Sequence, residues 1–393
     1  MGNQIKKILN YHCKCILLCL LVLSVLPMGA CSKFFPTPIS IEKMEFCQAM
    51  SVDVVDGQFK LGVMLKSVKP SSKGTGEDSG DGGQDIFSES GNSLSTIVRD
   101  LQARRPKVIF FGDIEALLVS KNAIKDKFEN IMDFFVRSRD FSEYSSIYAV
   151  EDDAFQMLKN MNKVGQSPVD IVIKSRLAKT KAFTDEVNFL NAIELLQPHS
   201  CGVLPIMVEI NGENGSEFEL KGFGVILNKS WVGVLDESQS RGLNVLKNNL
   251  KAAVLSFEID DLDSKISIGL DSISAKTFIK PKKNNGKIEF DISVKLNASI
   301  TEVSKSNALK AQELIDKCQS SLSQIVKQDI ENCLNFAQQI SADFVGLFQK
   351  YRLWHKTESD KIKPQWNDKF KDITINVKVN SVITRSHLVS IDS

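Results

Sequence analysis

Short apolar runs predict several strands in the first half of the chain. Residues 47–68 form two β-like runs around Asp56-Gly57, a dipeptide that favours a tight hairpin turn. Between residues 93 and 200 such runs are separated by segments with the apolar periodicity of a helix. Alternating helices and strands predict a sheet covered by helices. We expect strands at 107–111, 144–151 and 169–175, and helices at 93–105, 114–119, 128–136 and 153–161.

Strand patterns dominate the chain after residue 200. Residues 204–210 and 218–236 have such patterns, with an expected turn at Asn228-Lys229. Asn285-Gly286 favours another two-residue hairpin turn. Every second residue from 288 to 300 is apolar, so we expect one face of this strand to be buried.

The longest helical pattern lies between Leu309 and Tyr351. Apolar residues recur there mostly every three to five positions, with no proline among them. The pattern is long for a globular protein, so it predicts either one long helix or two helices that meet near Asp329. We expect its apolar stripe to pack on the preceding strand. Residues 372–386 return to an alternating pattern, which is typical of a final strand.

Together these patterns predict a multidomain α+β fold. We expect mixed or antiparallel β-sheets, each covered by helices, and a long C-terminal helical stretch packed on a sheet. The expected domains are an N-terminal α/β domain over residues 41–200, a small β-rich middle domain over 201–270 and a C-terminal α+β domain over 271–393. Residues 73–91 are rich in glycine and poor in large apolar residues, which predicts a mobile loop.

The first thirty residues have the pattern of an export signal. Three lysines precede an apolar run, residues 16–26, which is too short to cross a bilayer as a helix. Met28-Gly29-Ala30-Cys31 then resembles the bacterial lipobox, in which the cysteine thiol receives a diacylglyceryl group. We therefore expect a lipoprotein signal peptide over residues 1–30, lipid attachment at Cys31 and a tether over residues 31–40. The alternatives are an ordinary exported chain in which Cys31 is incidental, and an N-terminal core helix.

Charge and cysteine content exclude several kinds of partner and site. The net charge of the whole chain is +1, and it becomes −2 when the three signal lysines are removed. Electrostatic binding to nucleic acid or to anionic lipid is therefore not expected from the overall charge, and we expect affinity for a membrane to come from the lipid anchor. Cys47, Cys201, Cys318 and Cys333 are scattered and form no CxxC pair, which argues against a disulfide framework and a zinc site. We expect them to act as small buried hydrophobic residues.

Motifs of catalysis and metal binding are missing from the sequence. His199, His355 and His387 each stand apart from acids and cysteines at metal-ligand spacing, and no nucleophile elbow or P-loop occurs. The acid pairs Asp152-Asp153 and Asp260-Asp261 lie in polar stretches beside strands, which favours solvated turns over acid/base catalysis. The sequence therefore predicts a protein that is not an enzyme, with no cofactor and no metal.

Three stretches, taken in order, resemble one known family. They are residues 107–141, residues 222–248 and residues 342–386, the last with Asp343, Trp366 and Phe370. The chain is similar in these stretches to the Ger(x)C family, the lipoprotein C subunits of nutrient germinant receptors in spore-forming bacteria. The matching residues in the second stretch are Gly224, Gly233, Leu235, Asp236, Glu237, Arg241, Gly242 and Leu243.

The resemblance implies a function in spore germination. It implies a lipid-anchored, non-enzymatic C subunit that assembles with the A and B membrane subunits of a germinant receptor. It also implies a location on the outer face of the inner spore membrane, held there by the palmitate-type anchor at Cys31. The alternative is a solute-binding lipoprotein of an uptake transporter, which would need two similar α/β lobes around a cleft. The β-rich pattern after residue 200 argues against that alternative.

Overall fold

The computed structural model describes residues 39–67, 84–167, 169–170, 172–173, 185–197, 199–212, 215–261, 264–304 and 311–386. Contacts divide the chain into two units, residues 1–44 and 45–393. The described end of the first unit forms a short 3₁₀-helix, η3 (Ile41–Lys43). No helix in the described ranges is long and apolar enough to cross a membrane.

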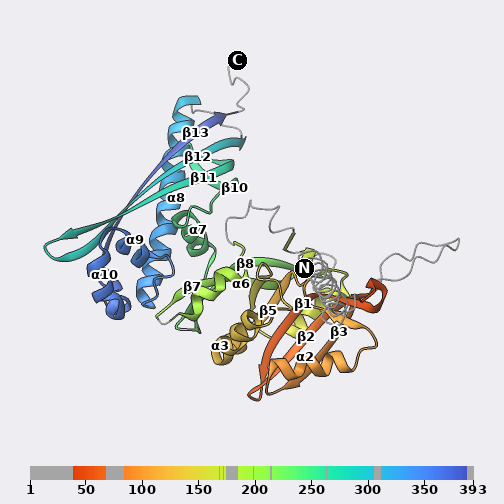
Figure 1. Cartoon of the computed structure of the whole chain (residues 1–393). Coiled ribbons are helices and arrows are strands. Elements are labelled where there is room, and N and C mark those ends of the chain that lie inside the picture. The colour runs from red at the N-terminus through yellow and green to blue at the C-terminus, as the bar shows by residue number, and fades with distance from the viewer. Residues whose placement is uncertain are drawn as a thin grey trace, which may run out of the picture. The chain divides into compact units, whose positions relative to one another are not determined.

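The larger sheet of the second unit is mixed (Figure 1). Its strand order is β3-β2-β1-β5-β6-β7-β8-β9, and β4 pairs with β1. The central strands β1, β5, β6 and β7 run parallel, and antiparallel arms extend the sheet on both sides. The strands are β1 (Met44–Val55), β2 (Gln58–Ser67), β3 (Gln84–Gly91), β4 (Val108–Phe110), β5 (Ala116–Ser120), β6 (Ser146–Val150), β7 (Cys201–Gly212), β8 (Gly215–Leu227) and β9 (Ser230–Leu235).

Helices cover both faces of this sheet. Along β5, Leu117 and Val119 belong to one apolar cluster and Ala116 and Leu118 to another, because alternate residues of a strand point to opposite faces. Buried side chains of α4 (Ala154–Lys163) belong to the second cluster. Helices on the other face contribute side chains to the first cluster: α2 (Leu94–Ala103), α3 (Lys121–Arg137), α6 (Phe189–Ala192) and η5 (Ile193–Leu196).

The predicted helix at 114–119 is wrong, because most of this segment is strand β5. All five residues of β5 are buried. A central parallel strand is apolar on both faces, so its sequence is a continuous apolar run without a period of two. Periodicity cannot distinguish such a run from a buried turn of helix.

The predicted strand at 169–175 is also wrong. Residues 169–170 and 172–173 are helical. Ser167 starts this segment: its Oγ accepts a bond from the backbone N–H of Asp170 (3.2 Å), and Asp170 accepts one from the backbone N–H of Ser167 (3.0 Å). This reciprocal pairing is typical of a helix start.

Part of the predicted loop at 73–91 is a strand. Residues 84–91 form β3, which pairs with β2 over its whole length, and residues 73–83 lie outside the described ranges. Backbone pairing at a sheet edge does not need an apolar sequence. Side chains add to the pairing: the Arg105 guanidinium lies 4.1 Å from the centre of the Phe87 ring, and Arg104 forms an ion pair with Glu89.

The two predicted hairpin turns and the predicted turn at Asn228-Lys229 are confirmed. Asp56 and Gly57 have φ values of 51° and 77°, and Val55 pairs with Gln58 across the turn. Asn285 and Gly286 have φ values of 48° and 80°. Positive φ at both central residues is the geometry of the hairpin turn that these dipeptides favour. The Asn228-Lys229 turn has the same geometry.

The smaller sheet has the order β10-β11-β12-β13. Strand β12 runs antiparallel to β11 and parallel to β13. The expected buried face of β12 is confirmed from Phe290 to Ile300, where every second side chain is buried. The strands are β10 (Ala253–Asp261), β11 (Ser264–Asn284), β12 (Lys287–Val303) and β13 (Thr374–Ser386).

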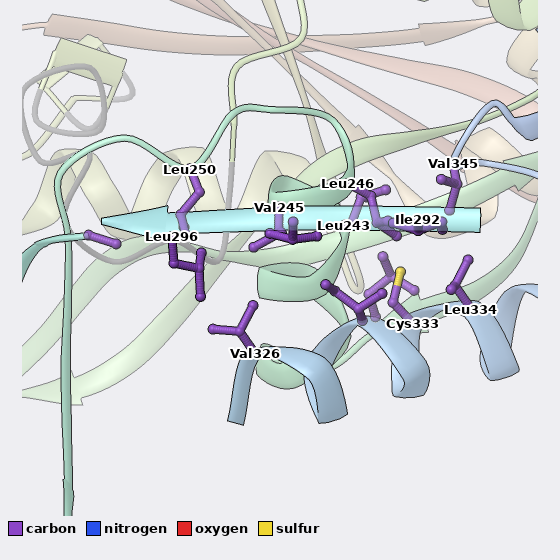
Figure 2. Packing of buried hydrophobic residues seen from close by; sticks show 14 of the residues in the cluster. Leu243, Val245, Leu246, Leu250, Ile292, Leu296, Val326, Cys333, Leu334 and Val345 are labelled. Carbon is purple, nitrogen blue, oxygen red and sulfur yellow. The ribbon is translucent and has the colours of Figure 1, made fainter. Parts of the chain in front are cut away.

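The long helix α8 (Ala311–Gln339) packs on this sheet (Figure 1). Figure 2 shows Val326, Cys333 and Leu334 of α8 facing the β12 side chains Ile292 and Leu296. Asp329 lies inside α8, so the pattern corresponds to one long helix there and not to two helices meeting at that residue. The remaining helices of this part are α7 (Glu237–Leu246), α9 (Leu347–Trp354), α10 (Lys356–Ile362), η6 (Lys363–Gln365) and α11 (Trp366–Phe370).

The fold is therefore the predicted α+β arrangement of two mixed sheets with helices packed on them. Strands β7 to β9 are hydrogen-bonded into the sheet of the N-terminal half, whereas β10 opens the second sheet. Hydrogen bonding alone does not define domains, so the limits at 200 and 270 remain predictions.

Candidate functional site

A cleft of about 820 Å³ lies among the described residues. One wall comes from residues 185–203, around α6, η5 and the start of β7. The other wall comes from residues 343–367, from the segment before α9 to the start of α11. The polar and aromatic groups that matter below are His199, Cys201, Lys247, Asp343, Arg352 and Trp366.

Asp343 holds the second wall together. Its carboxylate accepts bonds from the backbone N–H groups of Gly346 (2.9 Å), Leu347 (2.8 Å) and Phe348 (2.7 Å), and so it caps the N-terminus of α9. It also accepts a bond from Trp366 Nε1–H (2.9 Å). Burial raises the pKa of Asp343 to about 6, although these four donors act to lower it. The carboxyl group is therefore still mostly ionised at neutral pH.

An aromatic cluster surrounds the Asp343 bond to Trp366. The Trp366 ring centre lies 5.1 Å from that of Phe348 and 6.2 Å from that of Tyr351. His355 stacks on Tyr351 at 4.8 Å. His355 therefore contributes to packing at the end of α9, and the cluster fixes α9 and α11 next to each other.

Lys247 is one of the cations that line the cleft. It caps the C-terminus of α7, and its side chain remains accessible to solvent. Desolvation lowers its pKa, although Cys333, Asp185, Cys201 and Asp343 act in the opposite direction. No ion pair of Lys247 occurs within the described part of the chain. A lowered pKa beside a cleft is one sign of a functional position, although solvent around the exposed Lys247 side chain screens the charge.

We expect the change Lys247→Met to stabilise the protein at neutral pH by less than about 1 kcal/mol, because solvent around the exposed side chain screens much of the desolvation cost. The folded state binds the lysine proton less tightly than the unfolded state. The penalty is therefore present at neutral pH and is relieved as the pH rises through the lowered pKa towards 10.5. Urea unfolding at pH 7 and at alkaline pH measures both effects. The exposed Lys251→Met is the matched control, and an equal gain in both variants would contradict the cost assigned to Lys247.

A second buried charge joins α7 to α8. Arg241 Nε and a terminal nitrogen donate to the two carboxylate oxygens of Asp329 at 2.5 and 2.9 Å. Ser238 Oγ also donates to Asp329 (2.7 Å) and accepts a bond from Asn332 (2.9 Å). A planar guanidinium bound through two parallel bonds fixes both distance and orientation. This pair therefore sets the crossing of α7, which carries Lys247 at its end, over α8.

The start of α7 is specified locally. Asp236 accepts a bond from the backbone N–H of Gln239 (2.8 Å), and Gln239 returns one by accepting from the backbone N–H of Asp236 (3.0 Å). This capping box satisfies two N–H groups that have no partner inside the helix. Asp236, Arg241 and Gly242 were matched from the sequence as family residues, and all three act at the α7–α8 contact or at the start of α7.

The cysteines of the described residues are all free thiols. Burial raises the pKa of Cys47, Cys201 and Cys333 well above the usual range and that of Cys318 to about 11. A thiol that stays protonated is a poor nucleophile. Cys47, Cys318 and Cys333 are buried as predicted, and Cys201 is partly buried beside the cleft.

Among the described residues, the histidines and acid pairs named from the sequence do not come together. His199 lines the cleft, His355 stacks on Tyr351, and His387 lies outside the described residues. Asp153 caps α4, and Asp152 and Asp260 are exposed. Within the ranges described, no group of three or more metal-ligating side chains is close enough to hold an ion.

Sequence reasoning missed the buried acids Asp53 and Asp329. Asp53 accepts bonds from the backbone N–H groups of Ala154 (2.8 Å) and Phe155 (3.0 Å), which lie at the start of α4. The sequence did contain a signal for a buried Asp53, because it is the one acid within the apolar run that precedes Asp56-Gly57. Residues 1–30, Cys31 and the tether up to residue 38 lie outside the described ranges, so the predicted anchor remains a prediction.

Comparisons with known proteins cover most of the described chain. Residues 38–209 match the family described as spore germination protein N-terminal domain. Residues 221–387 match the family described as spore germination B3/GerAC like, C-terminal. The two matches occur in this order and leave only residues 210–220 unmatched between them.

Two relatives from Bacillus subtilis (strain 168) are similar over most of their length. Spore germination protein YndF is 23% identical over 318 residues, which cover 79% of this chain and 77% of that protein. Spore germination protein B3 is 20% identical over 341 residues, covering 84% and 88%. The crystal structure of the GerBC protein shares the fold, with a TM-score of 0.54 at 18% identity over 85% of this chain and 96% of that chain. The chain therefore belongs to the Ger(x)C family of spore germination proteins.

Proposed function

We propose that the protein is the lipid-anchored, non-enzymatic C subunit of a spore nutrient germinant receptor, needed for germination through assembly with A and B membrane subunits. The observation that carries the proposal is the pair of spore germination family matches, which together extend from residue 38 to residue 387. The lipobox-like pattern that ends at Cys31 supports the anchor.

The anchor gives a physical role to Cys31. A diacylglyceryl group inserts two acyl chains, and two chains give stable attachment whereas one gives only marginal binding. Attachment confines the folded unit to a layer at the membrane and raises its effective concentration near membrane partners. The contacts between subunits can then be individually weak. We place the protein on the outer face of the inner spore membrane.

The described cleft supports a binding role more than a catalytic one. The carboxylate of Asp343 is occupied by four donors, and the thiol of Cys201 is held protonated by burial. Lys247 lines the cleft with an exposed positive charge, a group that can position a ligand. The two sheets differ in size and strand order, which argues against the paired similar lobes of a solute-binding lipoprotein.

We expect Cys31→Ala to abolish lipid attachment, to release the protein from membranes and to impair nutrient-triggered germination. Metabolic labelling with radioactive palmitate, membrane flotation and the germination response of the spores measure the three effects. Cys19→Ala makes the same substitution inside the signal run and is the control, because it should leave all three unchanged. Normal labelling and normal membrane retention in the Cys31→Ala variant would refute the anchor.

A further inference from the structure

Two large apolar side chains project from the end of α9. Leu353 has the highest exposed fraction, 80%, of the large apolar side chains in the described part of the protein, and Trp354 beside it is 63% exposed. The buried face of α9 consists of Leu347, Phe348 and Tyr351, which pack into the core. Leu353 and Trp354 are therefore not needed for the core, and their exposure to water is unfavourable.

Positive charge surrounds this apolar pair. Lys350 precedes Leu353 and Trp354 by three and four residues, so all three lie on one face of the helix. Arg352 and Lys356 flank the pair and are exposed. From residue 347 to 363 the chain has five cations and two acids. One of these acids, Glu358, is already paired with Lys283 at 2.8 Å.

This composition identifies the partner as an anionic lipid surface. Tryptophan favours the boundary between headgroups and acyl chains, and lysine and arginine extend their charged ends towards lipid phosphates. Lysine is depleted from the apolar centre of protein–protein interfaces, which argues against a protein as the occupant. We propose that Leu353 and Trp354 enter the headgroup layer of an anionic membrane, with Lys350, Arg352 and Lys356 contacting the lipid phosphates.

Such a contact would orient the folded unit. The proposed anchor is a single attachment point, so it does not by itself select one orientation of the folded unit. A second contact at the end of α9 selects one of them and presents the same surfaces to membrane partners. The proposal rests on the proposed membrane location, but it concerns a different residue from the anchor and is tested separately.

Tryptophan fluorescence of the full chain tests the contact. The other two tryptophans, Trp231 and Trp366, are only 9% and 4% exposed, so the difference between the unsubstituted protein and Trp354→Phe reports Trp354. The chain is reconstituted in vesicles of phosphatidylcholine and phosphatidylglycerol whose acyl chains carry bromine. We expect the Trp354 emission to shift to shorter wavelength, to be quenched by bromine and to be shielded from aqueous acrylamide.

Charge variants test the electrostatic part. Lys350→Gln should lower the equilibrium constant for lipid contact of Trp354 about fivefold, the effect of one cation near an anionic surface. Lys378→Gln on the exposed face of β13 is the control and should have no effect. Equal quenching in vesicles of phosphatidylcholine alone would overturn the anionic assignment.

Three further outcomes separate the alternatives. Emission of Trp354 that stays accessible to acrylamide and is not quenched by bromine would overturn the proposal. Shielding from acrylamide without bromine quenching would mean that protein covers the site, and would also overturn it. Flotation of the same vesicles with Cys31→Ala reports the anchor independently, so a failed anchor and a failed contact give different results.

Discussion

Replacing Asp343 by alanine is expected to lower the free energy of unfolding by about 3–5 kcal/mol, the effect of breaking a buried charged network. The change removes the acceptor of three backbone N–H groups at the start of α9 and of Trp366 Nε1–H. Each buried donor left without a partner costs about 1–3 kcal/mol. Urea unfolding followed by circular dichroism measures the loss.

The control for this change is Asp368→Ala. Asp368 lies in α11 close to Trp366 in sequence, but its side chain is exposed. We expect a change of less than about 0.5 kcal/mol there, as for most surface substitutions. Equal losses in the two variants would show that the buried donors around Asp343 do not carry the effect.

The pH dependence gives a second measure of the same group. Because the folded-state pKa of Asp343 is raised from 3.8 to about 6, the folded protein binds this proton more tightly than the unfolded chain. The stability that protonation adds is fully present below the unfolded pKa and is lost as the pH rises through 6. Asp343→Asn, which cannot titrate, should remove this slope between about pH 4 and pH 6. An unchanged slope would assign it to another group.

The elements that the sequence predicts well are those with local causes. The turns at Asp56-Gly57 and Asn285-Gly286 require positive φ at two adjacent residues, which these dipeptides tolerate. The buried face of β12 follows from a period of two over most of the strand. The prediction of a helix where β5 lies was wrong because this strand is buried on both faces, and such burial removes the period of two from its sequence.

The candidate site depends on partners that are distant in the sequence. Arg241 and Asp329 are 88 residues apart, and Asp343 and Trp366 are 23 residues apart. No local pattern shows that these acids are buried, because each stands in a helix or loop whose neighbours are partly polar. The resemblance to the Ger(x)C family picked out Asp343, Trp366 and Arg241 as residues, and the structure supplies the reason: each fixes one helix against another.

Gly242 permits the close approach of α7 to α8. A Cβ atom at this position would overlap the carbonyl oxygen of Asp329 and would lie 2.7 Å from its carbonyl carbon and 3.0 Å from the backbone nitrogen of Ile330. All of these are backbone atoms inside a long helix, so they cannot rotate away as a side chain can. Separating the helices would also stretch the Arg241–Asp329 pair and open the apolar cluster that contains Leu243 and Ile330.

We therefore expect Gly242→Ala to destabilise the protein by about 3 kcal/mol, the upper end of the usual cost of overpacking. The sign is informative, because the same substitution in an unhindered helix interior stabilises by about 1 kcal/mol. Urea unfolding measures the loss. Gly212→Ala at the end of β7 is the control: the three atoms nearest to its Cβ would all belong to the flexible Glu217 side chain, which can move. If Gly242→Ala were as stable as the control, α7 and α8 would not be in backbone contact, and the position assigned to Lys247 in the cleft would lose its support.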